Sequence, residues 1–249
     1  MLSNFLSTNK YEVQFAQNED DLSAAQRLRY EVFNVELGEG LKASGETRRD
    51  EDIYDDQCDH LLVIFRQTGA VIGTYRMQTF FNARRNNGLY TAKEFNLSTL
   101  PDQLLQSSVE VGRACISAEH RNGRVLFLLW RGLAKYMMRN EKRYLFGCCS
   151  LTSQSPQEAW NVMKYLEMHH HVHDKFLLDT TANFECPKKE PESEKVDQIS
   201  LPQLFRLYMD LGAKVCSHPA MDREFKTIDY LVLLDVKKLD ERTRMLCFN

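Results

Sequence analysis

The sequence lacks a long apolar run and lacks concentrated positive charge. No apolar segment approaches the roughly 18–20 residues that cross a bilayer, and residues 1–10 have neither the basic nor the apolar stretch of a signal peptide. Its 32 lysines and arginines are outnumbered by 35 acidic residues, which gives a net charge of −3. Nucleic-acid binding needs clustered positive charge, so we expect no nucleic-acid partner.

Cysteine is present without the pattern of a disulfide framework. Seven cysteines, an odd number without a secretory signal, indicate a reducing compartment. We therefore expect a soluble, cytoplasmic protein, and peripheral contact with the inner face of a membrane is compatible with that location. Cys148 and Cys149 lie inside an apolar segment, where buried, inert thiols are expected rather than a nucleophile.

The apolar periodicity predicts an α/β fold with a mixed, mostly antiparallel central sheet and helices on both of its faces. A helix is expected to begin at Asp20 or Asp21 and to end before Gly38. The other expected helices are 125–138, 201–211 and one that begins at Ser155. The expected strands are 11–16, 60–66, 70–80, 108–117, 144–150, 213–217 and 228–236. We expect a single domain over residues 1–249, with insertions near 81–107 and 172–200.

The strand at residues 108–117 carries the most informative spacing. Glu110 and Arg113 are three residues apart, which in a regular strand places them on opposite faces of the sheet. A bulge at Gly112 would bring both to one face and leave a backbone N–H for a thioester oxyanion. An edge-strand ion pair without chemistry explains the same spacing equally well.

An anion site is expected directly after this strand. Arg121, Gly123 and Arg124 precede the apolar helix, and backbone amides at a helix N-terminus favour negative charge. These three residues would suit the phosphate of a pantetheine arm. Loops that combine glycine and arginine are common, so the signal is only moderately specific.

Several further stretches carry a family resemblance. They are residues 28–33 (LRYEVF), 52–55 (DIYD), 58–63 (CDHLLV), 73–76 (GTYR), 110–113 (EVGR), 129–134 (LWRGLA), 145–152 (LFGCCSLT), 211–216 (LGAKVC) and 229–234 (DYLVLL). With them the chain resembles the GNAT-fold acyltransferases that make lyso-ornithine lipid from ornithine and acyl carrier protein, sometimes labelled hemolysins. More distantly it is similar to acyl-homoserine lactone synthases and N-acyl amino acid synthases.

The resemblance implies a set of site residues and a donor. The site positions of the lactone synthases are occupied here by Arg29, Phe33, Asp52, Asp55, Arg76, Glu110 and Arg113. The usual acetyl-CoA loop of GNAT enzymes is degraded at residues 121–125. This departure favours a 4'-phosphopantetheine thioester on acyl carrier protein as donor over acyl-CoA, with no bound cofactor.

Roles follow from the chemistry of these side chains. Glu110 is the predicted general base for the acceptor amine, and Arg113 and Arg76 could hold a carboxylate or phosphate. Asp52 and Asp55 lie in an acidic loop with Asp50, Glu51, Asp56 and Asp59. They could grip the acceptor's ammonium, although a solvated loop has the same composition. Arg29 and Phe33 share a helix face as ordinary surface residues also do, and His60 is expected to be structural.

No metal site is expected. His169 and His173 are four residues apart, but no cysteine or carboxylate completes a zinc pattern around them. The acidic loop lacks the glycine and terminal glutamate of an EF-hand.

The predicted function is therefore transfer of a long-chain acyl or 3-hydroxyacyl group to the amine of an amino acid, ornithine first. Glycine or another acceptor, and a non-catalytic acyl-binding module, are the alternatives.

Overall fold

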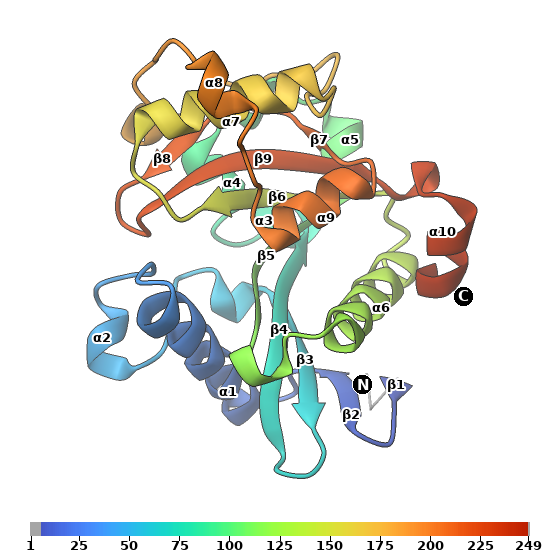
Figure 1. The fold of residues 1–249 in the computed structure, drawn as a ribbon. Coiled ribbons are helices and arrows are strands. Elements are labelled where there is room, and N and C mark those ends of the chain that lie inside the picture. Colours follow the sequence, from blue (N-terminus) through green and yellow to red (C-terminus); the bar gives the residue numbers. More distant parts are fainter. Residues whose placement is uncertain (1–5, 249) are drawn as a thin grey trace. The chain divides into compact units, whose positions relative to one another are not determined.

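The computed structural model describes residues 6–248 and divides them into two compact units (Figure 1). The first unit comprises the chain up to Asn87, Val111–Lys142 and the segment from Glu241 onward. The second comprises Gly88–Glu110 and Arg143–Asp240. The single domain over residues 1–249 stays a prediction.

An antiparallel sheet forms the centre of the first unit. Its strands are β1 (Leu6–Ser7), β2 (Tyr11–Phe15), β3 (Asp59–Phe65) and β4 (Ala70–Thr79), each paired with the next. The second half of β5 (Ser108–Ile116) adjoins β4. Gly69 adopts φ +73° in the β3–β4 turn, which joins the strands expected at residues 60–66 and 70–80 as an antiparallel hairpin.

Helices cover both faces of this first sheet. The helices α1 (Glu19–Tyr30) and α6 (Gly123–Arg139) lie on opposite sides of β3 and β4 (Figure 1). The side chain of Asn18 caps α1 by accepting from the amide of Asp21 at 2.9 Å, which corrects the predicted start at Asp20 or Asp21. The chain continues as a π-helical segment, Glu31–Glu36, and turns at Gly38 and Gly40, both with positive φ.

The apolar helix α6 packs unusually close to the sheet. A Cβ at Gly132 would overlap the side chain of Leu61 on β3, so glycine is required by the approach of helix and strand. The C-terminal helix α10 (Glu241–Phe248), which the sequence pattern did not reveal, packs against α6. The remaining short helices of this unit are α2 (Ser44–Thr47), a 3-10 turn at Asp55–Gln57, α3 (Phe80–Arg84) and a 3-10 turn at Ala118–His120.

The second unit is built on a mixed sheet. The first residues of β5 run parallel to β6 (Tyr144–Leu151), and β6 is antiparallel to the long strand β9 (Thr227–Asp235). The short strands β7 (Lys214–Val215) and β8 (Ala220–Asp222) also pair with β9. The sequence predicted β6 and β9 closely and did not predict β8.

Short helices replace the irregular segment expected at residues 81–107. They are α3, α4 (Thr91–Glu94), a 3-10 turn at Leu97–Thr99 and α5 (Asp102–Gln106). The helices α7 (Pro156–Met168), capped by Ser155 as predicted, α8 (Ser193–Val196) and α9 (Gln203–Asp210) follow, with a 3-10 turn at Ala182–Phe184 between α7 and α8 and another at Val236–Lys238 after β9.

Alternation along β9 directs neighbouring side chains to different helices. The hydroxyl of Tyr230 donates to the backbone oxygen of Ala159 on α7 at 2.7 Å, and its ring contacts Phe205 on α9. The adjacent Asp229 groups with Glu94 of α4 instead. Successive strand residues face opposite sides, so helices cover both faces of this sheet too. The predicted α/β fold, with a mixed and mostly antiparallel sheet, is confirmed.

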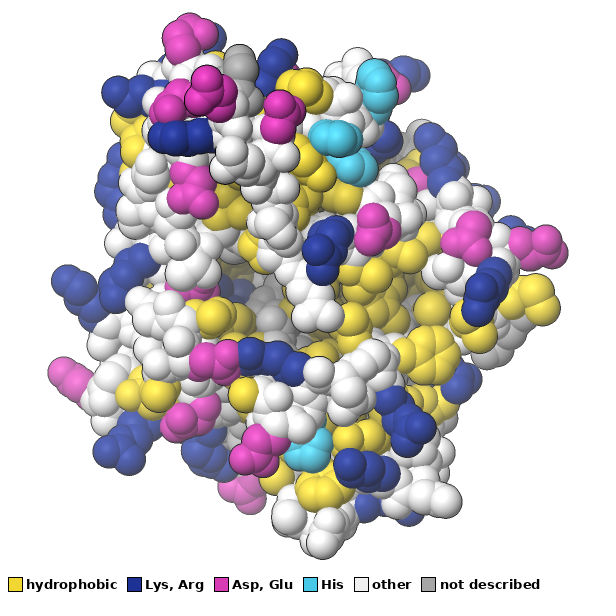
Figure 2. All heavy atoms as spheres, in the orientation of Figure 1, with side chains coloured by type: hydrophobic (Ala, Val, Ile, Leu, Met, Phe, Trp, Pro, Cys, Tyr) yellow, Lys and Arg dark blue, Asp and Glu magenta, His cyan; other side chains and the backbone are white. Residues whose placement is uncertain are grey.

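The surface carries both signs of charge. Figure 2 shows lysine and arginine side chains interspersed with acidic ones on the visible face. Among residues 6–248, no helix is long and apolar enough to cross a membrane.

Candidate active site

A buried network of arginines and aspartates forms the polar centre of the first unit. Arg29 of α1 has no exposed side-chain surface, and its two terminal nitrogens bind the carboxylate of Asp55 at 3.0 and 2.7 Å. Its Nε lies 3.0 Å from Oδ2 of Asp50, and one terminal nitrogen also donates to the Asp50 backbone oxygen. A planar guanidinium suits this bidentate arrangement, which lysine could not reproduce.

Two further arginines complete the network from the sheet. One terminal nitrogen of Arg76, in β4, donates hydrogen bonds to Asp52 at 2.6 Å and to Asp55 at 2.8 Å. Arg113 of β5 lies 3.3 Å from Asp50 and 3.2 Å from Asp52. Each aspartate is therefore shared by two arginines. Asp50 also belongs to the network, although no feature of its sequence neighbourhood distinguishes it from the other acids of its loop.

The charges of the network stabilise one another. Burial alone would raise the pKa of Asp55 and of Asp52, but the neighbouring guanidiniums outweigh burial and hold both pKa values below their usual range. Burial would likewise lower the pKa of Arg76, and Asp52 and Asp55 raise that pKa instead. Because arginines already occupy both carboxylates, gripping the acceptor's ammonium with Asp52 and Asp55 stays a prediction that the contacts do not favour.

His60 and Phe33 lie beside this network in structural positions. The ring Nε2 of His60 donates to the backbone oxygen of Asp55 at 3.0 Å, and burial lowers the pKa of this histidine. Phe33 lies in the π-helical segment after α1 and packs against the cluster of Leu28, Val32 and Cys115. Single π-helical turns often occur near functional sites, but no substrate contact of Phe33 is established.

The strand β5 has the backbone irregularity that its spacing suggested. The left-handed residue is Arg113, with φ +51°, rather than Gly112. The parallel pairing of β5 with β6 ends at Glu110. Glu110 belongs to the second unit and Arg113 to the first, so their common cleft stays a prediction.

Glu110 is held rigidly by α4. Its Oε1 accepts from the amide of Thr91 at 2.8 Å and from the Thr91 hydroxyl at 2.7 Å, and its Oε2 accepts from the amide of Tyr90 at 3.1 Å. An ionised carboxylate has about four acceptor positions. These three bonds fix the orientation of the carboxylate.

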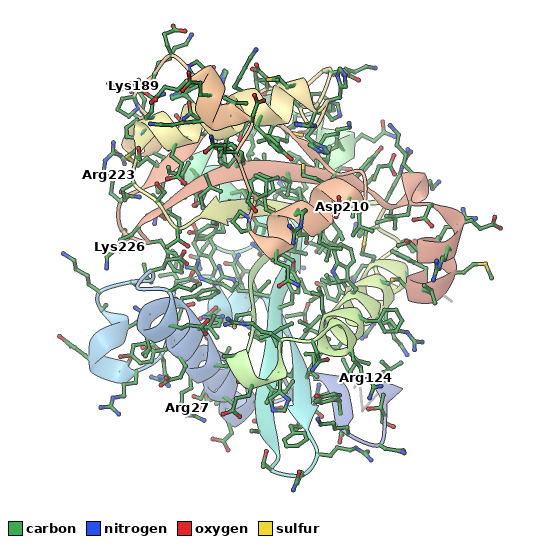
Figure 3. The ribbon with its side chains drawn as sticks, viewed as in Figure 1. Arg27, Arg124, Lys189, Asp210, Arg223 and Lys226 are labelled. Atoms are coloured by element: carbon green, nitrogen blue, oxygen red, sulfur yellow. The ribbon has the colours of Figure 1, made fainter. Side chains whose placement is uncertain are left out.

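The beginning of α6 has a pocket of about 310 Å³ lined by Lys10, Tyr11, Asn122 and Arg124. The side chain of Asn122 caps the helix by accepting from the amides of Arg124 and Val125 at 3.1 and 3.2 Å. Arg124 projects outward from the first turn (Figure 3). The sequence indicated Arg124 but not Lys10, which lies far from it along the chain.

Arg121 is engaged elsewhere. Its guanidinium forms a bidentate pair with Glu36, with one nitrogen at 2.6 Å, and its Nε donates to the backbone oxygen of Ile116 at 3.0 Å. Gly123 begins α6, and a Cβ there would meet open space. A pantetheine contact by Arg121 or Gly123 stays a prediction.

A second acidic group lies in the second unit. One carboxylate oxygen each from Glu94, Asp222 and Asp229 falls within 4.8 Å of the others. Among the described residues, these three acids have the spacing of metal ligands. The four histidines near residue 170 do not have that spacing. The signal that the sequence offered was Asp229 itself, an acid in an otherwise apolar strand.

The cysteines contribute no nucleophile. All seven are free thiols. Burial raises the pKa of Cys148 and of Cys149. The carboxylate of Asp229 adds to this effect at both thiols, and that of Glu94 adds to it at Cys148. Both thiols therefore stay protonated near neutral pH, as expected for inert residues.

Comparison with known proteins identifies the fold and the relatives. Residues 28–131 match the family model described as an acetyltransferase (GNAT) domain. A crystal structure from Lactobacillus plantarum, described as an N-acetyltransferase, superimposes with a TM-score of 0.50 at 14% identity over 91% of this chain and 99% of that one. The lactone synthase LasI gives a TM-score of 0.48 at 13% identity, with 96% and 94% covered.

The sequence relatives are more specific. An L-ornithine N(alpha)-acyltransferase of Agrobacterium fabrum is 32% identical over 244 residues, which cover 93% of this chain and 83% of that protein. The predicted acyltransferase activity is confirmed by this likeness together with the GNAT match. The chain belongs to the family of the L-ornithine N(alpha)-acyltransferases.

Proposed function

We propose that the protein transfers a long-chain acyl or 3-hydroxyacyl group from acyl carrier protein to the α-amine of ornithine. The observation that carries the acceptor is the likeness to an L-ornithine N(alpha)-acyltransferase over 93% of the chain. The product would be a lyso-aminolipid. Glycine and other amino acids are the competing acceptors.

Glu110 is the proposed base. The three donors from Tyr90 and Thr91 hold its carboxylate in one orientation, and a positioned carboxylate can take the proton that the amine must lose. The amine nitrogen attacks the thioester carbonyl carbon, the C–S bond breaks, and the pantetheine sulfur leaves and is protonated. The products are an amide and a free thiol, and no acyl-enzyme forms.

The donor would dock at the beginning of α6. Lys10 and Arg124 flank the pocket there and supply positive charge for a phosphopantetheine phosphate and for an acidic carrier protein. The amides of Arg124 and Val125 are already capped by Asn122, so the two side chains carry this interaction. Acyl-CoA has the same phosphate and is the alternative donor.

The arginine–aspartate network would position this machinery. Arg76 and Arg113 each contact two aspartates, and these ion pairs fix β4 and β5 at the residues that the family resemblance implies. We infer that both arginines act mainly by holding the strands in place.

The proposal includes a cytoplasmic location. Seven free thiols are compatible with a reducing compartment. An acylated amino acid partitions into lipid, so contact with the inner face of a membrane would help release of the product.

The test is acyl transfer by the purified protein, followed by product mass. Acyl carrier protein loaded with a 3-hydroxyacyl chain is incubated with ornithine, lysine, glycine or glutamine, and acyl-CoA replaces it in a parallel series. We expect an N-acylated ornithine and release of free carrier thiol. A product with another amino acid alone, or none with any acceptor, contradicts the proposal.

A matched pair of variants tests the role of Glu110. Glu110→Gln keeps shape but removes the basic carboxylate, and we expect kcat to fall about 100-fold or more. Glu185→Gln changes an exposed glutamate of the same unit and should leave kcat unchanged. Equal kcat for both variants excludes Glu110 as the base.

A further inference from the structure

One face of the second unit's sheet carries a row of acidic side chains. In β5 and β6, Glu110 is the register partner of Phe146, so its side chain shares a face with Phe146 and with Cys148, two residues further along. In β6 and β9, Cys148 is the partner of Leu231, which places Asp229 on that face too. The row therefore runs from Glu110 past Cys148 to Asp229.

The short helix α4 lies against this row and adds a third carboxylate. Thr91, its first residue, holds Glu110, and Glu94, its last, reaches the thiol of Cys148 at 3.5 Å. Oxygens of Glu94, Asp222 and Asp229 then lie within 4.8 Å of one another. We call these three residues the acidic cluster. One helical turn thus separates the cluster from the carboxylate of Glu110.

The acidic cluster has no cation of its own. Its side chains are almost fully buried, with exposures of 0% for Glu94, 2% for Asp222 and 3% for Asp229. In the part of the chain that the structure describes, none of the three forms an ion pair with a lysine or arginine. Buried carboxylates normally have such a partner.

The nearest cations along the sequence are directed elsewhere. Lys93 pairs with Glu224 at 3.2 Å, and Arg223 donates to the backbone oxygens of Asn183 and Glu185. Arg223 and Lys226 project outward from the β8–β9 turn (Figure 3). Lys93 and Arg223 therefore pair with groups outside the acidic cluster.

Two oxygens of the acidic cluster also lack hydrogen-bond donors. Oε1 of Glu94 and Oδ1 of Asp229 are buried and accept no hydrogen bond from a donor group of the described residues. Such atoms are rare in native proteins, and each calls for a ligand. Asp222, by contrast, accepts from the amides of Glu224 and Phe225 at 2.9 and 2.7 Å, and these two bonds fix the orientation of its carboxylate.

The titration of the acidic cluster agrees with a missing cation. Burial and the neighbouring carboxylates raise the pKa of Glu94 well above its usual range, and burial raises the pKa of Asp229 to about 7. Without a ligand, the acids would hold protons in its place. A bound ammonium group can replace those protons and satisfy the two oxygens.

We propose that Glu94, Asp222 and Asp229 bind the side-chain ammonium of a diamino-acid acceptor and leave its α-amine to Glu110. This assignment rests on the proposed function and explains how a diamino acid is chosen over a neutral one. The reacting amine and the anchored ammonium are separated by a short alkyl chain, in keeping with the single helical turn between Thr91 and Glu94.

The experiment compares acceptors that differ only in side-chain charge. Ornithine and norvaline have the same carbon chain, and only ornithine has the second ammonium. We expect Glu94→Gln and Asp229→Asn each to raise KM for ornithine at least about tenfold with little change in kcat. The kcat/KM for norvaline should stay unchanged or rise, so the preference for ornithine falls by at least about tenfold.

A matched control removes a carboxylate outside the acidic cluster. Glu224→Gln neutralises an exposed side chain in the β8–β9 turn and should leave the preference for ornithine as in the wild type. Circular dichroism and thermal melting establish that each variant is folded. If either Glu94→Gln or Asp229→Asn does not fold, the other variant tests the ammonium site by itself.

Three outcomes overturn the assignment or its basis. Cluster variants that keep the full preference for ornithine exclude the ammonium site. Purified wild-type protein that holds a divalent metal, lost in Glu94→Gln, assigns the acidic cluster to that metal instead. If the wild type acylates no amine, the proposed function fails. Calorimetric binding of ornithine to the wild type and to Glu94→Gln then still shows whether the acidic cluster binds the ammonium group.

Discussion

Asp55 illustrates how a single carboxylate can hold several elements together. It accepts from Arg29 of α1, from Arg76 of β4 and from the side-chain amide of Gln26. Gln26 and Arg29 both lie in α1, and Arg76 lies in the distant strand β4, so one nearly unexposed carboxylate joins the two elements. Removing its charge would leave the buried guanidiniums of Arg29 and Arg76 with too little negative charge around them. The resulting loss of unfolding free energy is larger than the contribution of an exposed ion pair.

We therefore expect Asp55→Asn to lower the free energy of unfolding by about 3–5 kcal/mol. Urea denaturation followed by circular dichroism measures this loss. The control is Lys164→Ala, which breaks the exposed pair with Glu167 at 3.6 Å and should change the free energy by no more than about 0.5 kcal/mol. Similar values for the two variants would contradict a structural role of the buried network.

Asp229 should give the stability an unusual pH dependence. Its pKa in the folded protein is about 7, against 3.8 without the fold, so between these values the folded state binds more protons than the unfolded state. The free energy of unfolding then falls as pH rises from about 4 to 7, at up to about 1.4 kcal/mol per unit.

Thermal melts across this pH range test the expectation. Asp229→Asn should make the decline shallower, and Glu94, whose pKa is also raised, contributes to the decline that remains. Asp52 and Asp55 have lowered pKa values, so their contribution is present above about 3.8 and is lost only as pH falls below it. The change in stability due to Asp229 and the change due to Asp52 and Asp55 therefore fall in different pH ranges. A decline that persists unchanged in Asp229→Asn would assign it to another group.

At the scale of elements, α6 packs closely on β3 in the first unit. Gly132 allows this approach because it has no Cβ, and Leu61 opposite has no exposed surface into which to move. Alanine is the better helix former by about 1 kcal/mol. We expect the overlap to dominate, so that Gly132→Ala lowers the free energy of unfolding by about 1–3 kcal/mol.

A double-mutant cycle with Leu61→Val measures this contact directly. The smaller valine gives the added methyl group some room. The loss of unfolding free energy in the double variant should therefore be smaller than the sum of the losses in the two single variants. Gly45→Ala is the matched control, because no atom lies within 4 Å of a Cβ there, and it should be neutral or slightly stabilising. Strict additivity at Gly132 and Leu61 would refute the packing argument.

Sequence patterns revealed the elements with regular periods and missed those that depend on distant partners. The β3–β4 hairpin and the apolar helix α6 have local signals: Gly69 in the turn and a continuous apolar segment from Val125. The strand β8 has three residues and exists by pairing with β9. The bulge at Gly112 stays a prediction, and the residue with positive φ is its neighbour Arg113.

The same distinction applies to the candidate site. Glu110, Arg113 and Arg76 stood out because their motifs are local and resemble a family. Glu94 and Asp229 are separated by more than half of the chain, and only the fold brings them to one face of a sheet. Asp50 looked like one more acid in a solvated loop, and its role depends on the buried guanidinium of Arg29.

For the whole molecule, a net charge of −3 poses a problem for the proposed donor. An acidic carrier protein is repelled by the net charge, so association must depend on local positive charge near the docking point. Lys10 and Arg124 supply it at the pocket before α6. Exposed charges act within about one Debye length, roughly 10 Å at 0.1 M salt, so their attraction should weaken as salt is added.

We expect Lys10→Glu and Arg124→Glu each to raise KM for acyl carrier protein several-fold at low salt, with kcat nearly unchanged, because opposite charges steer the encounter and not the chemistry. Steady-state kinetics at several salt concentrations measure this, and the variants should differ least from the wild type at high salt. Lys189→Glu makes the same change in net charge at an exposed residue of the second unit. If it raises KM equally, the attraction comes from the charge of the whole protein, and α6 is not the docking point.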